Sequence, residues 1–166
     1  EAVNGAPFYV MDFVEGQVIR NGDLARQLTE GQRANAGRSI VDVLARIHAV
    51  DVDAVGLGDL GRREDYLARQ LKRWHGQWEK SKTRELPVVE DVHAGLLAAI
   101  PPQQRSTIVH GDYRLDNCLV GDDGEVVAVL DWEICTLGDP LADAGLLLVY
   151  WSEPADAHQI PANAPT

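Results

Sequence analysis

Three polar residues, Asp112, Asn117 and Asp131, stand at the ends of short apolar segments that we expect to be strands. One strand leads into His-Gly-Asp at residues 110–112, Asn117 opens a second, and the Gly-Asp-Asp-Gly turn at 121–124 starts a third that ends at Asp131. A hairpin of this kind would bring three carbonyl-type ligands to one place. That set suits phosphoryl transfer, in which one carboxylate orients and deprotonates a hydroxyl while an Asn and a second Asp hold Mg²⁺ against the phosphates.

Each of these residues also has an ordinary structural interpretation. Asp112 and Asn117 are residue types that tie loops together through hydrogen bonds to neighbouring backbone. Asp131 is harder to explain in this way, because an ionised carboxylate at the edge of a buried strand is costly unless a cation or donors meet it. A two-carboxylate hydrolase built on Asp112 and Asp131 is a further alternative, and it would need neither Asn117 nor Mg²⁺.

Three sequence blocks resemble the aminoglycoside phosphotransferase family. They are His-Gly-Asp-x-x-x-x-Asn at residues 110–117, Leu-Asp-Trp at 130–132 and Gly-Asp-Pro-x-x-Asp at 138–143, and the first two are variants of protein-kinase motifs. The resemblance implies an α+β, mainly helical fold, namely the large C-terminal lobe of a protein-kinase-like fold with a catalytic β-hairpin. Within the family, Phe-Tyr-Val-Met at 8–11 and Val-Leu-Asp-Trp-Glu at 129–133 are closest to the kinase-like domains associated with acyl-CoA dehydrogenases.

The resemblance also implies roles. It implies ATP-dependent transfer of the γ-phosphoryl group to a small-molecule hydroxyl, aminoglycoside-like or hydroxyacyl-CoA-like, with Asp112 as base and Mg²⁺ held by Asn117 and Asp131. Arg114 is a second candidate catalytic residue, because by analogy with a lysine of protein kinases it would neutralise charge on the phosphate. An ion pair with Asp112 or Asp116 is the alternative for Arg114. The alternative function is a nucleotide- or partner-binding pseudokinase module without catalysis.

Other residues near these blocks are expected to support the loop. His110 matches the family motif as a scaffold residue without chemistry. Asp139 precedes Pro140 and is expected to cap the helix that begins there. Asp143 is expected to be structural, for example by hydrogen-bonding back to the catalytic loop as in relatives. His48 is expected to be a packing or capping residue.

The composition excludes several classes of function. The 166 residues carry a formal charge of -11, which argues against nucleic acid or an anionic membrane as partner, because phosphate groups demand an excess of Lys and Arg. An acidic balance is compatible with a cationic substrate and is also ordinary for cytosolic proteins. Cys118 and Cys135 are too few for a disulfide framework or a zinc site, and no apolar run approaches the roughly 18 residues of a bilayer span. We therefore expect a cytoplasmic protein, and the family resemblance implies that it is an enzyme acting on a small hydroxylated molecule.

The N-terminal residues are expected to form a strand and a hinge. Residues 7–13 are apolar and aromatic, which predicts a strand that ends near Glu15 and Gly16. The family resemblance implies that backbone groups of Asp12 and Val14 hydrogen-bond adenine, while an ordinary edge strand is the alternative. An exposed edge of this kind invites dimerisation.

Helical periodicity predicts four helices, at about residues 30–49, 62–80, 87–100 and 141–151. The first begins at a capping box formed by Thr29 and Gln32. The second carries an apolar stripe that is expected to be core, with the wall of a substrate pocket as the alternative. This stripe consists of Leu67, Leu71, Trp74 and Trp78. The third helix is expected to turn its valines and leucines inward, and the last, which is apolar nearly all round, to be buried.

This order is that of the large lobe of a kinase-like fold, and the family resemblance implies that the chain contains two parts of such a domain. Residues 1–16 would be the last small-lobe strand and the hinge, and residues 17–166 the helical large lobe, with the catalytic loop at 107–133 and a truncated C-terminal part. No glycine-rich phosphate loop, strand lysine or helix glutamate is evident upstream. We therefore expect a fragment with little activity alone, since phosphoryl transfer depends on the positioning and charge neutralisation that those elements supply.

Overall fold

The longest helix, α2 (Glu30–His48), supports the main hydrophobic core of the protein, here described from a computed structural model that covers residues 5, 8 and 10–151. Its start is fixed by the predicted capping box: the Thr29 hydroxyl accepts a hydrogen bond from Gln32 N at 3.2 Å, and Gln32 Oε1 accepts one from Thr29 N at 2.7 Å. The core side chains of α2 include Ile40 and Leu44, which pack against the strands that follow the catalytic loop. The predicted helix is therefore confirmed.

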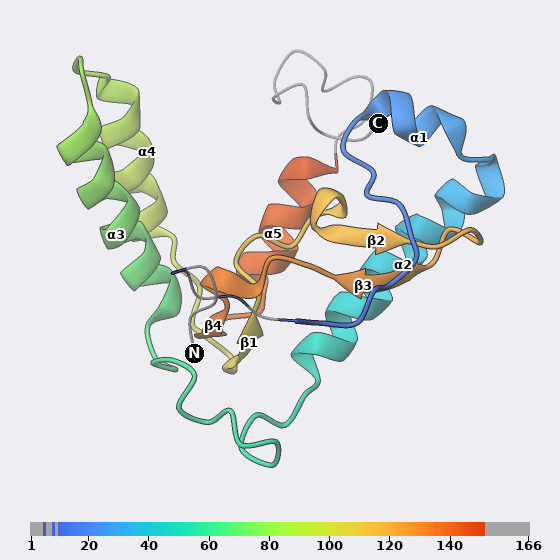
Figure 1. The fold of residues 1–166 in the computed structure, drawn as a ribbon. Helices are drawn as coiled ribbons and strands as arrows, with labels where there is room; N and C mark the ends of the chain where they lie inside the picture. The colour runs from blue at the N-terminus through green and yellow to red at the C-terminus, as the bar shows by residue number, and fades with distance from the viewer. Residues whose placement is uncertain (1–4, 6–7, 9, 152–166) are drawn as a thin grey trace.

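The predicted hairpin is also confirmed. Strands β2 (Cys118–Val120) and β3 (Val126–Val129) pair antiparallel, and the turn between them lies against α2 (Figure 1). Gly124 has a φ of +87°, and a Cβ atom there would overlap the backbone of Gln32, so both the conformation and the space require glycine. The Gln32 side chain donates to Asp122 O at 2.7 Å, which fastens the turn to the start of the helix.

A second two-stranded sheet leads into the catalytic loop. Strand β1 (Thr107–Val109) pairs antiparallel with β4 (Thr136–Gly138). Their side chains Ile108 and Leu137 form a small second core with Val52. The sequence block at 110–117 begins directly after β1, and the block at 138–143 begins at the last residue of β4. Both blocks therefore start from the same paired strands.

The remaining helices are α1 (Gly22–Gln27), α3 (Tyr66–Ser81), α4 (Pro87–Ala98) and α5 (Leu141–Tyr150), and the short 3₁₀ helices are Leu115–Asn117 and Trp132–Ile134. Helices α3 and α4 lie side by side and stand away from α2 and the strands (Figure 1). Helix α3 begins four residues later than predicted, after Asp65, which has a left-handed backbone with φ of +53°.

Two predictions of burial are wrong. No residue of α4 is buried, and the apolar side chains of Val88, Val92 and Leu96 are at least half exposed. In α5 only Asp143 and Leu147 are buried. The physical reason is that α4 packs mainly on α3, so within the described part of the chain no second layer covers the outer faces of these helices.

The predicted strand at residues 7–13 is not formed at the positions that the structure describes there, residues 8 and 10–13. A strand needs a hydrogen-bonded neighbour, and none pairs with these positions within the described residues. Pairing begins at Gln17, which exchanges two backbone hydrogen bonds with Val120 at 2.8 and 2.9 Å. None of the described helices is long and apolar enough to cross a membrane.

Candidate active site

The catalytic loop is anchored by the fully buried carboxylate of Asp143 on α5. Its oxygens accept backbone hydrogen bonds from His110 at 2.9 Å and from Gly111 at 2.8 Å, and they contact His48 Nε2 at 3.0 Å. A buried carboxylate is tolerated only when donors meet it. The three donors meet that requirement, and they confirm the expectation that Asp143 holds the loop and that His48 is a packing residue.

The imidazole of His110 connects the loop to the segment that carries Asp131. Its Nδ1 accepts a hydrogen bond from Asp112 N at 3.2 Å, which requires an unprotonated Nδ1, so Nε2 is the nitrogen that donates to Leu130 O at 2.8 Å. The side chain is fully buried. His110 therefore acts as the expected scaffold, in its neutral form.

Asp112 and Asn117 are brought together directly. The Asn117 side-chain nitrogen donates to Asp112 O at 2.8 Å and to Asp112 Oδ2 at 2.9 Å. Both amide hydrogens are then used within the loop, and the amide oxygen Oδ1 is left as an acceptor. The Asp112 carboxylate is part-exposed, so a hydroxyl can reach it from solvent.

Asp131 comes directly after a residue that is hydrogen-bonded to Asn117. Its neighbour Leu130 donates its backbone N–H to Asn117 O at 2.8 Å, so the backbone of 130–131 lies beside that of Asn117. Asp131 has a left-handed backbone with φ of +63°, a conformation that is uncommon outside glycine and is often found at functional sites. Its carboxylate is exposed and forms no hydrogen bond or ion pair with the residues that the structure describes.

The side-chain oxygens of Asn117 and Asp131 are of the chemical type that binds Mg²⁺. Asn117 keeps a carbonyl oxygen and Asp131 a carboxylate without a protein partner in the described chain, and hard cations such as Mg²⁺ prefer oxygen ligands, with one or two carboxylates and several waters.

Arg114 lies between two acidic residues of the loop. Its Nε is 3.2 Å from Asp112 Oδ1 and 3.1 Å from Asp116 Oδ1, and its guanidinium carbon sits 4.8 Å from the centre of the Tyr150 ring. The alternative raised from the sequence, an ion pair with Asp112 or Asp116, is thus formed with both. The same position keeps a positive charge beside the candidate base.

The two thiols and the buried tyrosine hydroxyl of this region are poor nucleophiles at neutral pH. Burial raises the pKa of Cys118 to about 12 and also raises the pKa of Cys135, so both thiols are protonated at neutral pH. Burial likewise raises the pKa of Tyr113, whose hydroxyl donates to Ile40 O at 2.7 Å. These three side chains belong to the support of the site.

The hinge residues Asp12 and Val14 are exposed and lie in an irregular segment. Val14 is three residues before Gln17, which pairs with Val120, itself three residues after Asn117. Because three extended residues span about 10 Å, the hinge segment runs near the same hairpin as Asn117. The structure shows no bonding partner for the backbone of either hinge residue among the positions described.

A groove of about 480 Å³ opens beside the catalytic loop. One wall is α3, and the other contains Gly111 and Ile134. The α3 residues that line it are Tyr66, Leu67, Arg69, Gln70, Arg73 and Trp74. The apolar stripe of this helix was expected to be core, with the wall of a pocket as the alternative. For Leu67 and Trp74 the structure has the alternative, since both line the groove and Trp74 is 59% exposed. The two arginines were not predicted, because the sequence does not say which face of α3 meets the loop.

The chain is similar in sequence to proteins named as acyl-CoA dehydrogenases. The chain is 40% identical over 143 residues to mouse acyl-CoA dehydrogenase family member 10, covering 86% of the chain and 13% of that protein. It is 33% identical over 159 residues to a protein of Arabidopsis thaliana named probable acyl-CoA dehydrogenase IBR3, and this match covers 90% of the chain and 19% of that protein. The chain thus spans less than a fifth of the length of these two relatives.

Solved structures show the same fold. A crystal structure of a candidate aminoglycoside phosphotransferase from Ralstonia eutropha superposes with a TM-score of 0.79 and 37% identity, over 87% of this chain and 44% of that one. The streptomycin–ATP complex of APH(2″)-IIa superposes with a TM-score of 0.56 at 20% identity, over 79% and 46%, which supports the fold alone. The predicted α+β, kinase-like fold is confirmed by these matches. Since the family model described as phosphotransferase enzyme family matches residues 1–164, the chain belongs to that family.

Proposed function

We propose that this protein transfers the γ-phosphoryl group of ATP to a hydroxyl of a small molecule, with Asp112 as base and Asn117 and Asp131 as the Mg²⁺ ligands. The observation that carries the proposal is the hydrogen bond of Asn117 to the Asp112 carboxylate at 2.9 Å. The backbone oxygen of Asn117 also accepts a hydrogen bond from Leu130, the residue before Asp131. Membership of a phosphotransferase family supports the reaction class.

In this proposal Asp112 orients the acceptor and takes its proton. The Asn117 amide fixes carboxylate oxygen Oδ2, and Arg114 lies beside Oδ1. A carboxylate held in this way presents a set direction to an incoming hydroxyl, and placement of the nucleophile is a large part of catalysis in phosphoryl transfer. Arg114 adds positive charge next to the reacting groups. Bound Mg²⁺ would neutralise charge on the phosphates.

The hinge would bind the base of the nucleotide. Peptide groups of Asp12 and Val14 are the candidates, because their segment runs toward Gln17 and hence toward the β2–β3 hairpin. Backbone donors and acceptors suit adenine, whose edge offers one of each, and the side chains at these positions then matter little.

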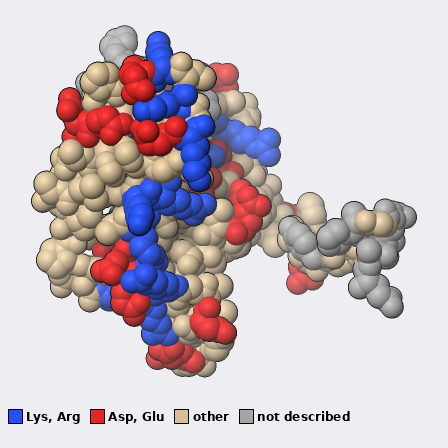
Figure 2. All heavy atoms as spheres, turned by 90° about the vertical axis from the view of Figure 1, so that its left-hand side faces the viewer, with Lys and Arg blue, Asp and Glu red and all other residues tan. Residues whose placement is uncertain are grey.

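We propose that the acceptor carries anionic groups, which favours a hydroxyacyl-CoA-like molecule over an aminoglycoside. Arg69 and Arg73 line the groove beside Gly111. Lys and Arg side chains form a band on the α3 and α4 side of the molecule (Figure 2), although the whole chain has a net charge of -11. A cationic wall attracts phosphate and repels an aminoglycoside. The names of the acyl-CoA dehydrogenase relatives point to the same class of acceptor.

Nucleotide binding tests the proposed ligands. ATP is titrated by calorimetry with and without Mg²⁺ into the wild type, Asp131→Asn and Asp112→Asn. We expect Mg²⁺-dependent binding in the wild type, at least about tenfold weaker binding for Asp131→Asn, and nearly unchanged binding for Asp112→Asn. Asp122→Asn is the matched control, because Asp122 is an exposed carboxylate on the hairpin turn. Wild-type MgATP affinity in Asp131→Asn would contradict the metal assignment.

Turnover tests the reaction itself. ADP release is measured on the protein at its native length with a hydroxyacyl-CoA and with an aminoglycoside as acceptors. We expect turnover with the first, and a loss of at least about 10²-fold in Asp112→Asn. Nucleotide binding without turnover on any hydroxylated acceptor would favour a pseudokinase, and faster turnover with the aminoglycoside would refute the anionic acceptor.

A further inference from the structure

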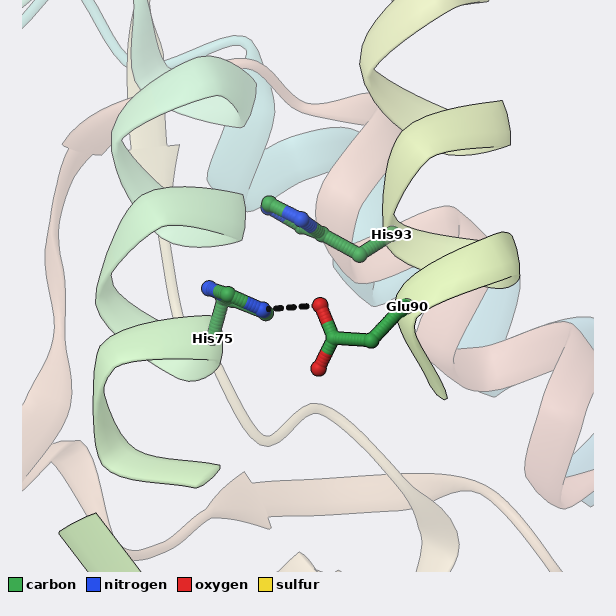
Figure 3. Close-up of side chains that lie close together, drawn as sticks. All are labelled: His75, Glu90 and His93. Atoms are coloured by element: carbon green, nitrogen blue, oxygen red, sulfur yellow. Dashed lines mark hydrogen bonds and ion pairs between the residues drawn. The ribbon is translucent and has the colours of Figure 1, made fainter. Parts of the chain in front are cut away.

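Three potential metal ligands meet between helices α3 and α4, on elements that carry none of the proposed catalytic residues. Figure 3 shows His75 projecting from α3 toward Glu90 and His93 on α4. Residues three apart share one face of a helix, which is why Glu90 and His93 point into the same space. One ligand atom of each residue lies within 4.8 Å of the other two.

The two imidazole rings are stacked, which disfavours a positive charge on both of them. Their centroids are 4.0 Å apart with an interplanar angle of 6°, and two imidazolium rings stacked so closely would repel each other. His75 Nε2 lies 2.8 Å from Glu90 Oε2, where it donates, because a carboxylate only accepts. Neutral imidazole is the form of histidine that binds metals.

His93 supplies an independent sign that a group is missing from this cluster. Its Nε2 is buried and has no hydrogen-bond partner in the described structure. Buried polar nitrogens are nearly always satisfied, so each exception needs an explanation. Coordination of a cation through this nitrogen would provide the partner.

We propose that His75, Glu90 and His93 bind a divalent transition-metal ion, with Zn²⁺ as the first candidate, at a site separate from the proposed phosphotransfer centre. Two imidazoles and one carboxylate with a water in the fourth position form a common zinc set. Ligands of tetrahedral zinc lie about 3.3 Å apart, so the present separations of up to 4.8 Å must contract. Because an imidazole binds a metal in the plane of its ring, the two stacked rings must also rotate away from parallel. Mg²⁺ and Ca²⁺ are disfavoured because they prefer an all-oxygen set.

The surroundings permit such a site. Glu90 is 48% exposed, so a hydrated ion can enter from solvent. The nearby Lys82 ammonium would oppose a cation, but it is paired with Glu79 at 2.9 Å and with Glu85 at 3.0 Å. On metal binding, His75 carries its proton on the nitrogen that does not coordinate, and the Glu90 carboxylate exchanges the His75 hydrogen bond for the ion.

The bound ion would brace the helical hairpin. Helix α4 has no buried residue of its own, so apolar packing alone fixes it weakly against α3. Arg73 and Trp74, which directly precede His75, line the groove beside the catalytic loop. A metal that joins α3 to α4 therefore steadies the wall at which we place the acceptor.

The test uses the untagged chain after treatment with a chelator. Calorimetric titration with ZnCl₂ is expected to show one saturable site per chain, and Co²⁺ is expected to give the visible absorption of a site with nitrogen ligands. Glu90→Gln and His93→Gln should each weaken Zn²⁺ binding at least about tenfold. Asp91→Asn, an exposed acidic residue next to Glu90, is the control and should bind as the wild type does. Zn²⁺ should also raise the unfolding temperature of the wild type and of Asp91→Asn.

The proposal fails if Zn²⁺ produces no saturable heat, or if the double variant His75→Gln/His93→Gln retains wild-type affinity. The first result would leave the cluster as a metal-free contact between two helices, and the second would place the ion elsewhere, for example at Cys135. Every variant is checked by circular dichroism, so that loss of binding is not confused with unfolding. MgATP binding is measured separately, so failure here leaves the proposed phosphotransferase function unaffected.

Discussion

The side-chain nitrogen of Asn117 lies 2.8 Å from the backbone oxygen of Asp112 and 2.9 Å from its carboxylate oxygen Oδ2. The candidate base and the candidate metal ligand are therefore one hydrogen-bonded unit. The amide hydrogens position the base, while the amide oxygen stays available to a cation. A residue that serves both purposes should tolerate almost no substitution.

Asn117→Asp should disable this unit. The substitution replaces an N–H donor by an oxygen that faces the Asp112 carboxylate, so a favourable contact becomes a repulsion between like charges. We expect turnover at native length to fall by at least about 10²-fold and the free energy of unfolding to fall by about 1–3 kcal/mol. ADP release and urea denaturation measure the two effects.

Gln77→Glu is the control for Asn117→Asp, because it adds the same charge at an exposed position of α3 outside the groove. It should change stability by less than about 0.5 kcal/mol. Equal losses of turnover and of stability in the two variants would show that the added charge, and not the contact with Asp112, is responsible.

Asp143→Asn should destabilise the fold. The carboxylate satisfies two backbone N–H groups and contacts His48, and an amide offers only one oxygen, so at least one buried donor would face an NH₂ group. We expect a loss of about 3 kcal/mol in the free energy of unfolding. Asp42→Asn, on the exposed face of α2, should lose less than about 0.5 kcal/mol. Equal stability of the two variants would show that Asp143 does not anchor the loop.

The elements that were predicted correctly are those with local causes. The capping box at Thr29, the glycine-bounded turn at 121–124 and the spacing from Asp112 to Asn117 all act over a few residues, so the sequence specifies them. The predictions that failed concern packing between distant elements. The outer faces of α4 and α5 are apolar, yet burial depends on whether another layer covers them, and residues 8 and 10–13 likewise find no strand partner in the described structure.

The same distinction applies to the candidate site. Its loop residues were identified because their types and spacing are themselves the signal. Arg69 and Arg73 were missed because they are ordinary charged residues of an amphipathic helix, and only the position of α3 beside Gly111 makes them part of a groove. His75, Glu90 and His93 were missed for a related reason, since their meeting depends on how two helices are aligned.

The two thiols should differ in reactivity. Burial raises the pKa of Cys118 to about 12, which lowers its thiolate fraction near neutral pH by about a thousandfold, and Cys135 is only half-buried. A thiol reagent at pH 8 should therefore modify Cys135 quickly and Cys118 only on unfolding. In Cys135→Ser the fast phase should be absent. A fast phase in that variant would mean that Cys118 is accessible.

The pH dependence that follows from Cys118 has a definite sign. The folded-state pKa lies above the ordinary value of 9.0, so the neutral thiol stabilises the fold fully below pH 9. This contribution is lost as the pH rises from 9 toward 12. Urea denaturation across that range measures it, and the decline should be shallower in Cys118→Ala than in the wild type.

Arg73→Gln should weaken acceptor binding and leave nucleotide binding intact. Arg73 lines the groove, with its guanidinium carbon 5.5 Å from the centre of the Trp74 ring, and a phosphate or carboxylate of the acceptor would gain a charge-assisted hydrogen bond there. Loss of that bond should raise KM for a hydroxyacyl-CoA about tenfold, with little change in kcat or in the Kd for MgATP. Lys72→Gln removes the same charge from an exposed neighbour that does not line the groove. It therefore distinguishes a direct contact between Arg73 and the acceptor from attraction of the acceptor by the positive charge of the band of Lys and Arg side chains. If both variants raise KM equally and the effect disappears at high salt, the arginine attracts the acceptor only through the field of the basic band.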